Sequence, residues 1–138
     1  MKIRPLIEKD REDFIECLNT LKPTKLTDEE FYFAYHGRYM DSTTTLVAEE
    51  NMQVIGTASF IIEKKFLGGY TKCCHIEDVA VKKNHQGKGV GKRLVEDILE
   101  RASEQDCYKV ILMCSNDNIP FYEKIGFKVQ DNAMRFDI

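Results

Sequence analysis

The residues best suited to chemistry form a glycine-rich turn, Gln86-Gly87-Lys88-Gly89-Val90-Gly91-Lys92. The turn follows a segment with strand character and precedes one with helical periodicity, so backbone N–H groups and the positive end of a helix dipole meet there. The three glycines permit positive φ and place no Cβ between the backbone and a ligand, and the two lysines add positive charge. The turn therefore favours a pyrophosphate. The alternative is a flexible turn that only begins the helix.

The spacing of this turn excludes two common nucleotide-binding motifs. In a P-loop alignment, Gln86 stands where the first glycine belongs and Arg93 where the hydroxyl belongs. A dinucleotide fingerprint needs G-x-G-x-x-G, whereas this chain has G-x-G-x-G. The pattern fits neither a P-loop kinase nor a dehydrogenase.

A predicted strand, helix and strand position the turn. The first strand is expected over Thr71 to Val81, and the helix runs from the turn to about Gln105. The apolar run Val110 to Met113 predicts a buried strand over Tyr108 to Cys114, parallel to the first and joined to it by a right-handed crossover. The buried face of the helix is expected to comprise Leu94, Val95, Ile98, Leu99 and Ala102.

The remaining elements lie on either side of this unit. Thr27 and Glu30 form a capping-box pattern before a helix expected over Phe31 to Met40. Further predictions are a strand at Lys2 to Leu6, a helix from about Asp10 with Phe14, Cys17, Leu18 and Leu21 on one face, a hairpin of Thr44 to Glu49 and Val54 to Ile62, a loop at Lys64 to Gly69, a short helix at Asn118 to Ile125, and one or two strands over Phe127 to Ile138.

The composition limits the class of protein. A chain of 138 residues suits one domain, here residues 1–138. The net charge of −3 gives no overall basic footprint for nucleic acid, and no apolar run reaches the roughly 20 residues of a membrane span. Because Met1 to Pro5 leads straight into charged sequence, we expect a cytoplasmic protein.

The five cysteines are an odd number without a Cys-x-x-Cys spacing, so reduced thiols are expected rather than a disulfide framework or a zinc knuckle. Cys73, Cys74 and His75 are consecutive, and neighbouring side chains on a strand point to opposite faces. The sequence therefore predicts no metal site.

The glycine turn after Val79-Ala80-Val81 resembles the acetyl-CoA motif of the GNAT N-acetyltransferases, and the resemblance covers nearly the whole chain. The segments His75 to Val81, Cys107 to Leu112 and Phe121 to Phe127 are similar to the glucosamine 6-phosphate N-acetyltransferase subfamily. The resemblance implies an α/β GNAT fold: a mixed, mostly antiparallel central sheet with a parallel, splayed strand pair and flanking helices. It also implies a homodimer and the direct acetylation of glucosamine 6-phosphate by acetyl-CoA on the way to UDP-N-acetylglucosamine.

The resemblance further implies where acetyl-CoA binds. The pantetheine would enter between the splayed strands, and the N–H of Val79 would polarise the thioester carbonyl. Tyr122 would protonate the departing thiolate, and the backbone carbonyl of Met113 would receive the amine. The implied cofactor-binding residues are Val79, Ala80, Val81, Gln86, Gly87, Lys88, Gly89, Val90, Gly91, Lys92, Asn118 and Tyr122.

The implied sugar contacts are Lys65, Glu77, Asp78, Tyr108 and Lys109. Two positions depart from the subfamily. Met113 stands where the subfamily has an aspartate, which preserves the carbonyl but not a side-chain role. Asp137 stands where a phosphate-binding arginine is expected, and Arg135 would lie on the same face of a strand and supply the cation instead.

Two other functions stay open. One is a GNAT enzyme that acetylates another small amine or a protein amine. The other is a catalytically silent acyl-CoA sensor, for which replacing Tyr122 with Phe would change nothing.

Overall fold

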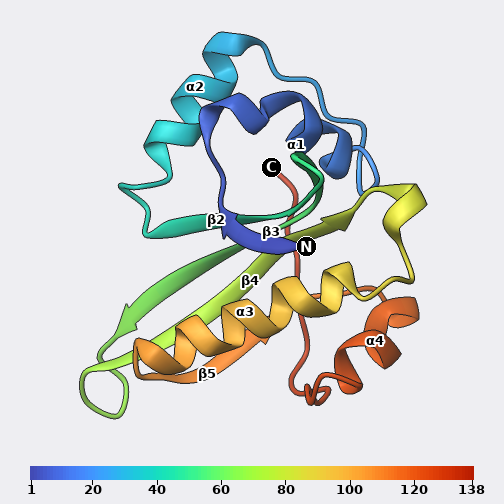
Figure 1. The fold of residues 1–138 in the computed structure, drawn as a ribbon. Coiled ribbons are helices and arrows are strands. Elements are labelled where there is room, and N and C mark those ends of the chain that lie inside the picture. Colours follow the sequence, from blue (N-terminus) through green and yellow to red (C-terminus); the bar gives the residue numbers. More distant parts are fainter.

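The computed structural model describes residues 1–138, and its centre is a five-stranded sheet in the order β1-β2-β3-β4-β5. The strands are β1 (Lys2–Pro5), β2 (Thr43–Glu50), β3 (Gln53–Lys65), β4 (Thr71–Val81) and β5 (Cys107–Leu112). Each neighbouring pair is antiparallel except β4 and β5, which are parallel. The expected mixed GNAT-type sheet is confirmed (Figure 1).

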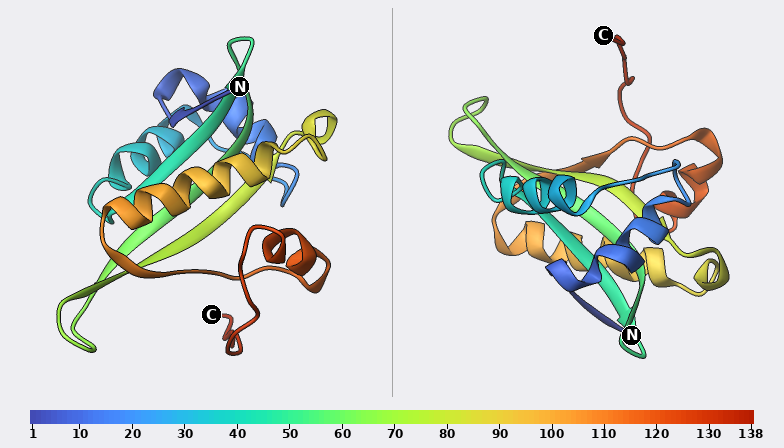
Figure 2. Two further views of the ribbon diagram at one scale, coloured as in Figure 1. Left: turned by 60° about the horizontal axis from the view of Figure 1, so that its bottom comes forward. Right: turned by 90° about the horizontal axis from the view of Figure 1, so that it is seen from above.

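Helices cover both faces of the sheet, with α3 (Val90–Glu104) on one face and α1 (Arg11–Leu18) and α2 (Asp28–Gly37) on the other (Figure 2). Alternation along β2 explains the two cores. Leu46 and Ala48 pack with α3, whereas Val47 packs with Phe14 of α1 and Phe31 of α2. The short helix α4 (Ile119–Glu123) follows β5. None of the helices combines the length and the apolar character that a bilayer span requires.

The predicted capping box is confirmed, and it fixes where α2 begins. The Thr27 hydroxyl accepts from the Glu30 N–H at 3.1 Å, and the Glu30 carboxylate accepts from the Thr27 N–H at 2.8 Å. The helix ends at Gly37, before the predicted Met40. Leu21 lies beyond the end of α1 and is exposed.

Gly56 of β3 allows α3 to lie close to the sheet. A Cβ at this position would come within 2.8 Å of Val90 Cγ1 and 3.2 Å of Leu94 Cδ1. The absence of a side chain therefore sets how near the first turn of α3 comes to β3.

The C-terminal prediction was wrong. Phe127 to Ile138 forms no strand, and the last backbone hydrogen bond runs from the Phe127 N–H to the Tyr122 carbonyl. Apolar residues alternate with polar ones at Met134, Phe136 and Ile138, but all three are exposed. The segment runs away from the sheet and pairs with none of its strands (Figure 2).

The prediction that the strand after α3 is buried was also wrong. All residues of β5 are half-buried or exposed, and Ile111 is 39% exposed. The reason is its position, because β5 is the edge strand and only β4 pairs with it. The expected loop at Lys64 begins slightly later, since β3 continues to Lys65.

Candidate active site

The parallel strands β4 and β5 stop pairing partway along their length. Their register runs from Lys72 opposite Cys107 to Ile76 opposite Leu112, where β5 ends. Strand β4 continues through Glu77 to Val81 with no partner on this side. The free backbone groups of this edge can bind an extended ligand in the way that an added strand would. The splayed strand pair expected from the sequence is therefore present.

A β-bulge interrupts β4 on its other edge at the same level. Thr57 pairs with Ala80 and Ser59 with Glu77, so Asp78 and Val79 together face the single residue Ala58. Asp78 has a φ of 50°, in the left-handed region. The bulge breaks the regular alternation of side chains at Glu77 and Asp78, both of which are exposed. It also interrupts the ladder beside Val79, whose N–H is the predicted oxyanion donor.

The glycine turn begins α3 in the predicted manner. Gly87 and Gly89 have φ values of 73° and 83°, and a Cβ at either position would meet nothing within 4 Å. The requirement for glycine is therefore conformational. Gly89 caps α3 without a side-chain hydrogen bond, and the first helical turn contains no acidic residue. The N–H groups at this end are left available to an anion.

Gly91 differs in conformation from the other two glycines of the turn. Its φ is not positive, because it lies inside the first turn of α3. A Cβ there would lie 3.4 Å from the Phe121 ring, in ordinary van der Waals contact, so Gly91 lies where α3 faces α4.

Two other residues of the turn have partners within the chain. The Gln86 side-chain amide donates to the Val81 carbonyl at 3.0 Å, which ties the turn to the end of β4. The Lys92 ammonium lies 3.6 Å from the Glu96 carboxylate on the exposed side of α3. Lys88 is exposed at the tip of the turn.

Tyr122 is a half-buried phenol on α4. Its ring packs edge-on against Phe127 at 5.8 Å and Phe121 at 4.8 Å between centroids. Burial raises the pKa of the Tyr122 phenol, and the nearby Cys114 raises it further. The phenol is therefore protonated at neutral pH and able to donate its proton.

Two predicted residues lie between β5 and α4. Met113 follows the end of β5 and is exposed, and Asn118 precedes the first residue of α4. Neighbouring elements therefore hold the predicted catalytic residues, with Val79 on β4, Met113 after β5 and Tyr122 on α4.

The predicted sugar contacts fall into two groups. Glu77 and Asp78 lie beyond the part of β4 that pairs with β5, whereas Lys109 on β5 is opposite Cys73 and Lys65 on β3 is opposite Thr71, towards the other end of β4. Tyr108 precedes Lys109 on β5, and the Lys65 ammonium lies 3.6 Å from the Glu63 carboxylate. The Lys109 ammonium lies 5.2 Å from the Tyr108 ring centroid. Arg135 instead belongs to the exposed C-terminal segment, where it donates to Asp137 at 2.5 Å. The expectation that Arg135 and Asp137 share a strand face does not hold within one chain, because the segment is not a strand.

Sequence reasoning missed Arg38, which follows α2. Its guanidinium donates to the Ser59 hydroxyl at 2.7 Å, and its Nε is buried without a partner. Burial lowers the pKa of Arg38, and the charge of Asp78 opposes that change. No motif marked this arginine, because its contacts come from β3 and β4, which are distant in the sequence.

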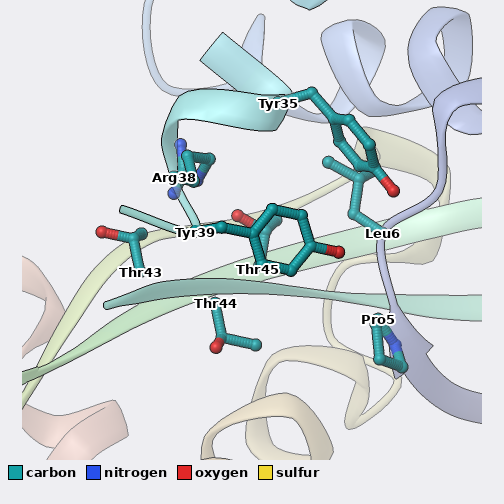
Figure 3. A pocket seen from close by; sticks show the side chains of 8 residues that line it. All are labelled: Pro5, Leu6, Tyr35, Arg38, Tyr39, Thr43, Thr44 and Thr45. Carbon is teal, nitrogen blue, oxygen red and sulfur yellow. The ribbon is translucent and has the colours of Figure 1, made fainter. Parts of the chain in front are cut away.

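Arg38 also lines a cavity of about 190 Å³ between α2 and β2 (Figure 3). The lining residues are Pro5, Leu6, Tyr35, Arg38, Tyr39, Thr43, Thr44 and Thr45. None of the predicted sugar contacts is among them. Arg38 both lines this cavity and donates to Ser59 on β3.

Comparison with known proteins agrees with this arrangement. The model of the Acetyltransferase (GNAT) family matches residues 5–127. A glucosamine 6-phosphate N-acetyltransferase of Arabidopsis thaliana is 44% identical over 91% of this chain and 88% of its own length. A glucosamine 6-phosphate N-acetyltransferase of Dictyostelium discoideum is 36% identical over 93% of this chain and 85% of its own length.

Solved structures show the same fold. The crystal structure of the Arabidopsis thaliana glucosamine-6-phosphate N-acetyltransferase superimposes with a TM-score of 0.92 at 40% identity, covering 99% of this chain and 97% of that one. A Trypanosoma brucei acetyltransferase gives a TM-score of 0.92 at 35% identity over 99% of both chains. The splayed strands, the glycine turn and these similarities together establish that the chain belongs to the GNAT acetyltransferase family.

Proposed function

We propose that this protein transfers the acetyl group of acetyl-CoA to the amine of D-glucosamine 6-phosphate, giving N-acetyl-D-glucosamine 6-phosphate and CoA. The observation that carries the proposal is the similarity to glucosamine 6-phosphate N-acetyltransferases, which extends over nine-tenths of the chain. The product would serve the synthesis of UDP-N-acetylglucosamine.

Acetyl-CoA would bind at the opening between β4 and β5. Its pyrophosphate would lie on the free N–H groups of the turn at Gly87 to Gly91. The pantetheine would run along Val79 to Val81, where β4 has no partner on this side. The side chains of Lys88 and Asn118 would complete the contacts.

The reaction needs a polarised carbonyl, a neutral amine and a stabilised leaving group. The Val79 N–H, next to the bulge, would donate to the oxygen that gains negative charge during attack. The Met113 carbonyl would accept a hydrogen bond from the attacking amine. The protonated phenol of Tyr122 would donate its proton to the CoA thiolate as the carbon–sulfur bond breaks, and the proton that the nitrogen loses on becoming an amide would pass to water, from which the phenolate is reprotonated.

The acceptor would lie along the exposed carboxylates of Glu77 and Asp78, which suit the hydroxyl and amino groups of an amino sugar. Lys65 and Lys109 provide point charges for the phosphate, and the Tyr108 phenol provides a further polar contact. Arg135 would reach this phosphate only from the C-terminal segment.

We further propose that the enzyme is a single-domain cytoplasmic homodimer. The exposed, alternating Met134, Phe136 and Ile138 support the dimer, because an extended segment of this kind gains partners on a second copy of the chain. The five free cysteines suit a reducing compartment.

The test is thiol release from acetyl-CoA with glucosamine 6-phosphate, measured beside unphosphorylated glucosamine, glucose 6-phosphate, polyamines and peptide amines. Release with glucosamine 6-phosphate alone supports the proposal. Release only with another amine retains the acetyltransferase reaction and refutes this acceptor. No thiol release with any amine, together with tight acetyl-CoA binding, would favour a catalytically silent acyl-CoA sensor.

A further inference from the structure

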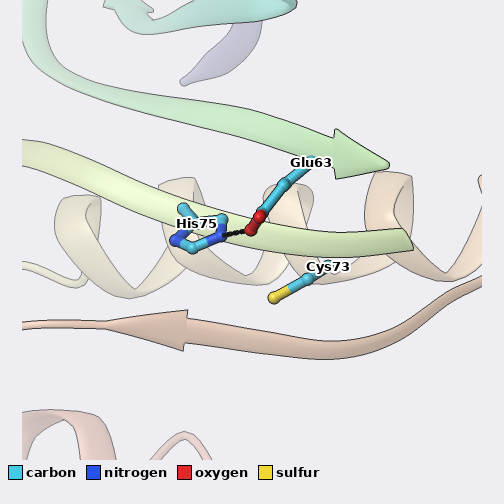
Figure 4. A group of neighbouring side chains, drawn as sticks. All are labelled: Glu63, Cys73 and His75. Atoms are coloured by element: carbon cyan, nitrogen blue, oxygen red, sulfur yellow. Dashed lines mark hydrogen bonds and ion pairs between the residues drawn. The ribbon is translucent and has the colours of Figure 1, made fainter. Parts of the chain in front are cut away.

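Three potential metal ligands from adjacent strands lie together on the sheet, apart from the opening between β4 and β5. The side-chain donor atoms of Glu63, Cys73 and His75 all lie within 4.8 Å of one another (Figure 4). None of the three has a role in the acetyl transfer described above.

Strand geometry brings these side chains together. Cys73 and His75 are two residues apart on β4 and therefore share a face. Glu63 is the register partner of Cys73 on β3, so its carboxylate lies diagonally across from the imidazole. Consecutive residues of one strand cannot form this group, because their side chains point to opposite faces. The alternate residue of β4 and the neighbouring strand β3 supply the other two ligands.

We propose that Glu63, Cys73 and His75 bind one divalent cation of the zinc class. A thiolate, an imidazole and a carboxylate are ligands that Zn²⁺ accepts together, and three protein ligands leave a fourth position open. Calcium and magnesium, which prefer oxygen ligands, are disfavoured by the thiol.

The separations require only small movements. Tetrahedral ligation at about 2.0–2.3 Å places ligand atoms roughly 3.3–3.6 Å apart. The His75 Nε2 and Glu63 Oε2 atoms are 2.7 Å apart in a hydrogen bond, so they must separate slightly for an ion to enter. The cysteine sulfur lies within 4.8 Å of the other two donor atoms, so it needs to approach them by no more than about 1.5 Å. Side-chain rotations in Glu63 and His75 can produce both changes.

The exposure of Glu63 and His75 allows an ion to reach the three side chains from solvent. The Cys73 side chain is fully buried, whereas the side chains of His75 and Glu63 are 31% and 44% exposed, so an ion can approach from their side. Lys65 contacts Oε1 of Glu63, the oxygen that His75 does not use. The carboxylate can therefore keep its lysine partner while Oε2 turns to the metal.

The test is a titration of chelator-treated protein with Co²⁺, followed by displacement with Zn²⁺. We expect one Co²⁺ per chain, a sulfur-to-cobalt charge-transfer band in the near ultraviolet, and its disappearance on adding Zn²⁺. Cys73→Ser should abolish the band. His75→Gln and Glu63→Gln should each weaken binding at least about tenfold, the lower end of the loss seen when an outer partner of a metal ligand is removed.

The chain offers a matched control in His36 and Glu8, a second histidine–glutamate pair at 3.0 Å that has no cysteine in its group. His36→Gln should leave the band and the affinity unchanged, and so should Cys107→Ser. The proposal is overturned if wild type shows no band, if the band persists in Cys73→Ser, or if His36→Gln weakens binding as much as His75→Gln. If Cys73→Ser does not fold, unchanged affinity in the two partly exposed variants overturns it.

Discussion

The two sides of the sheet use their polar groups in opposite ways. Where α1 meets the sheet, charged side chains are paired at short distances: Arg4 with Asp10 at 2.6 Å and Glu49 at 2.5 Å, and Lys82 with Asp13 at 2.6 Å. Between β4 and β5 and at the glycine turn, the carboxylates of Glu77 and Asp78 are exposed, β4 lacks a partner towards β5, and the first turn of α3 lacks a side-chain cap. The first region gains stability from satisfied groups, whereas the second retains free groups for ligands.

Breaking a pair in the first region should cause the largest effect. Lys82 is nearly buried and contacts both Asp13 and Glu16, at 2.6 and 2.7 Å. Lys82→Ala should lower the free energy of unfolding by about 2 kcal/mol, because it removes a buried side chain and leaves the partly exposed carboxylates of Asp13 and Glu16 without their cation. Urea denaturation measures this. Lys92→Ala, which removes an exposed pair with Glu96, should change it by less than about 0.5 kcal/mol. Equal losses in both variants would contradict the contrast.

Removing the hydroxyl of Tyr122 on α4, the predicted proton donor at the opening between β4 and β5, should reduce activity without reducing stability. Tyr122→Phe should lower kcat about 100-fold, within the range of lost general acid catalysis, and leave the KM for acetyl-CoA nearly unchanged. Steady-state kinetics and a thermal melt give the two readouts. Tyr32→Phe, on the exposed surface of α2, is the control. Full activity of the Tyr122 variant would leave the ring with only its packing against Phe121 and Phe127.

A substitution in the glycine turn tests whether the second region depends on its left-handed backbone. Gly89→Ala places a Cβ in open space but on a residue with a φ of 83°. The strain should lower stability by about 1 kcal/mol and raise the KM for acetyl-CoA as the N–H groups move. Gly37→Ala also meets open space, but without positive φ, and should not destabilise the protein. A tolerated Gly89→Ala would show that the turn does not need its left-handed geometry.

Lowering the pH should reduce the stability of the first region in a defined pH window. This effect should be smaller than those of the three substitutions above. Burial raises the pKa of Asp10, but hydrogen bonds from Arg4 and the Ile7 N–H outweigh it, and the net pKa is lowered from 3.8. A lowered folded-state pKa gives stability that is present above the unfolded value and lost as pH falls through the folded value.

Thermal melts should therefore show little change from pH 7 to about pH 5 and a decline below about pH 4. Asp10→Asn should have a shallower decline, because that carboxylate no longer takes up a proton. An equally steep decline in the variant would assign the acid sensitivity to other carboxylates.

Local signals predicted most of the fold. The capping box at Thr27, the strands on either side of the turn at Asn51, and the glycines before α3 all act over a few residues, and their predictions hold. The failed predictions concern position in the sheet. The apolar run in β5 indicates a strand but not that this strand lies at the edge of the sheet. The alternation of apolar and polar residues from Met134 to Ile138 resembles a strand, but it does not show whether another strand is available to pair with it.

The candidate site divides in the same way. Local sequence motifs mark Val79, the glycine turn and Tyr122. The elements that carry them, β4, the start of α3 and α4, are neighbours in the structure. Their catalytic roles remain predictions. Arg38 and the group of Glu63 with Cys73 and His75 arise from contacts between strands and helices that are distant in the sequence. No local pattern in one sequence contains that information.

The missing side chain of Gly56 has a further consequence for the turn. A Cβ there would approach both the Ala80 carbonyl, at 3.2 Å, and Val90 Cγ1, at 2.8 Å. Ala80 and Val90 lie just before and just after the turn, so both ends of this loop pack closely against one residue of β3. The loop is therefore closed before any ligand arrives, and the conformational entropy of closing it is met during folding rather than during binding.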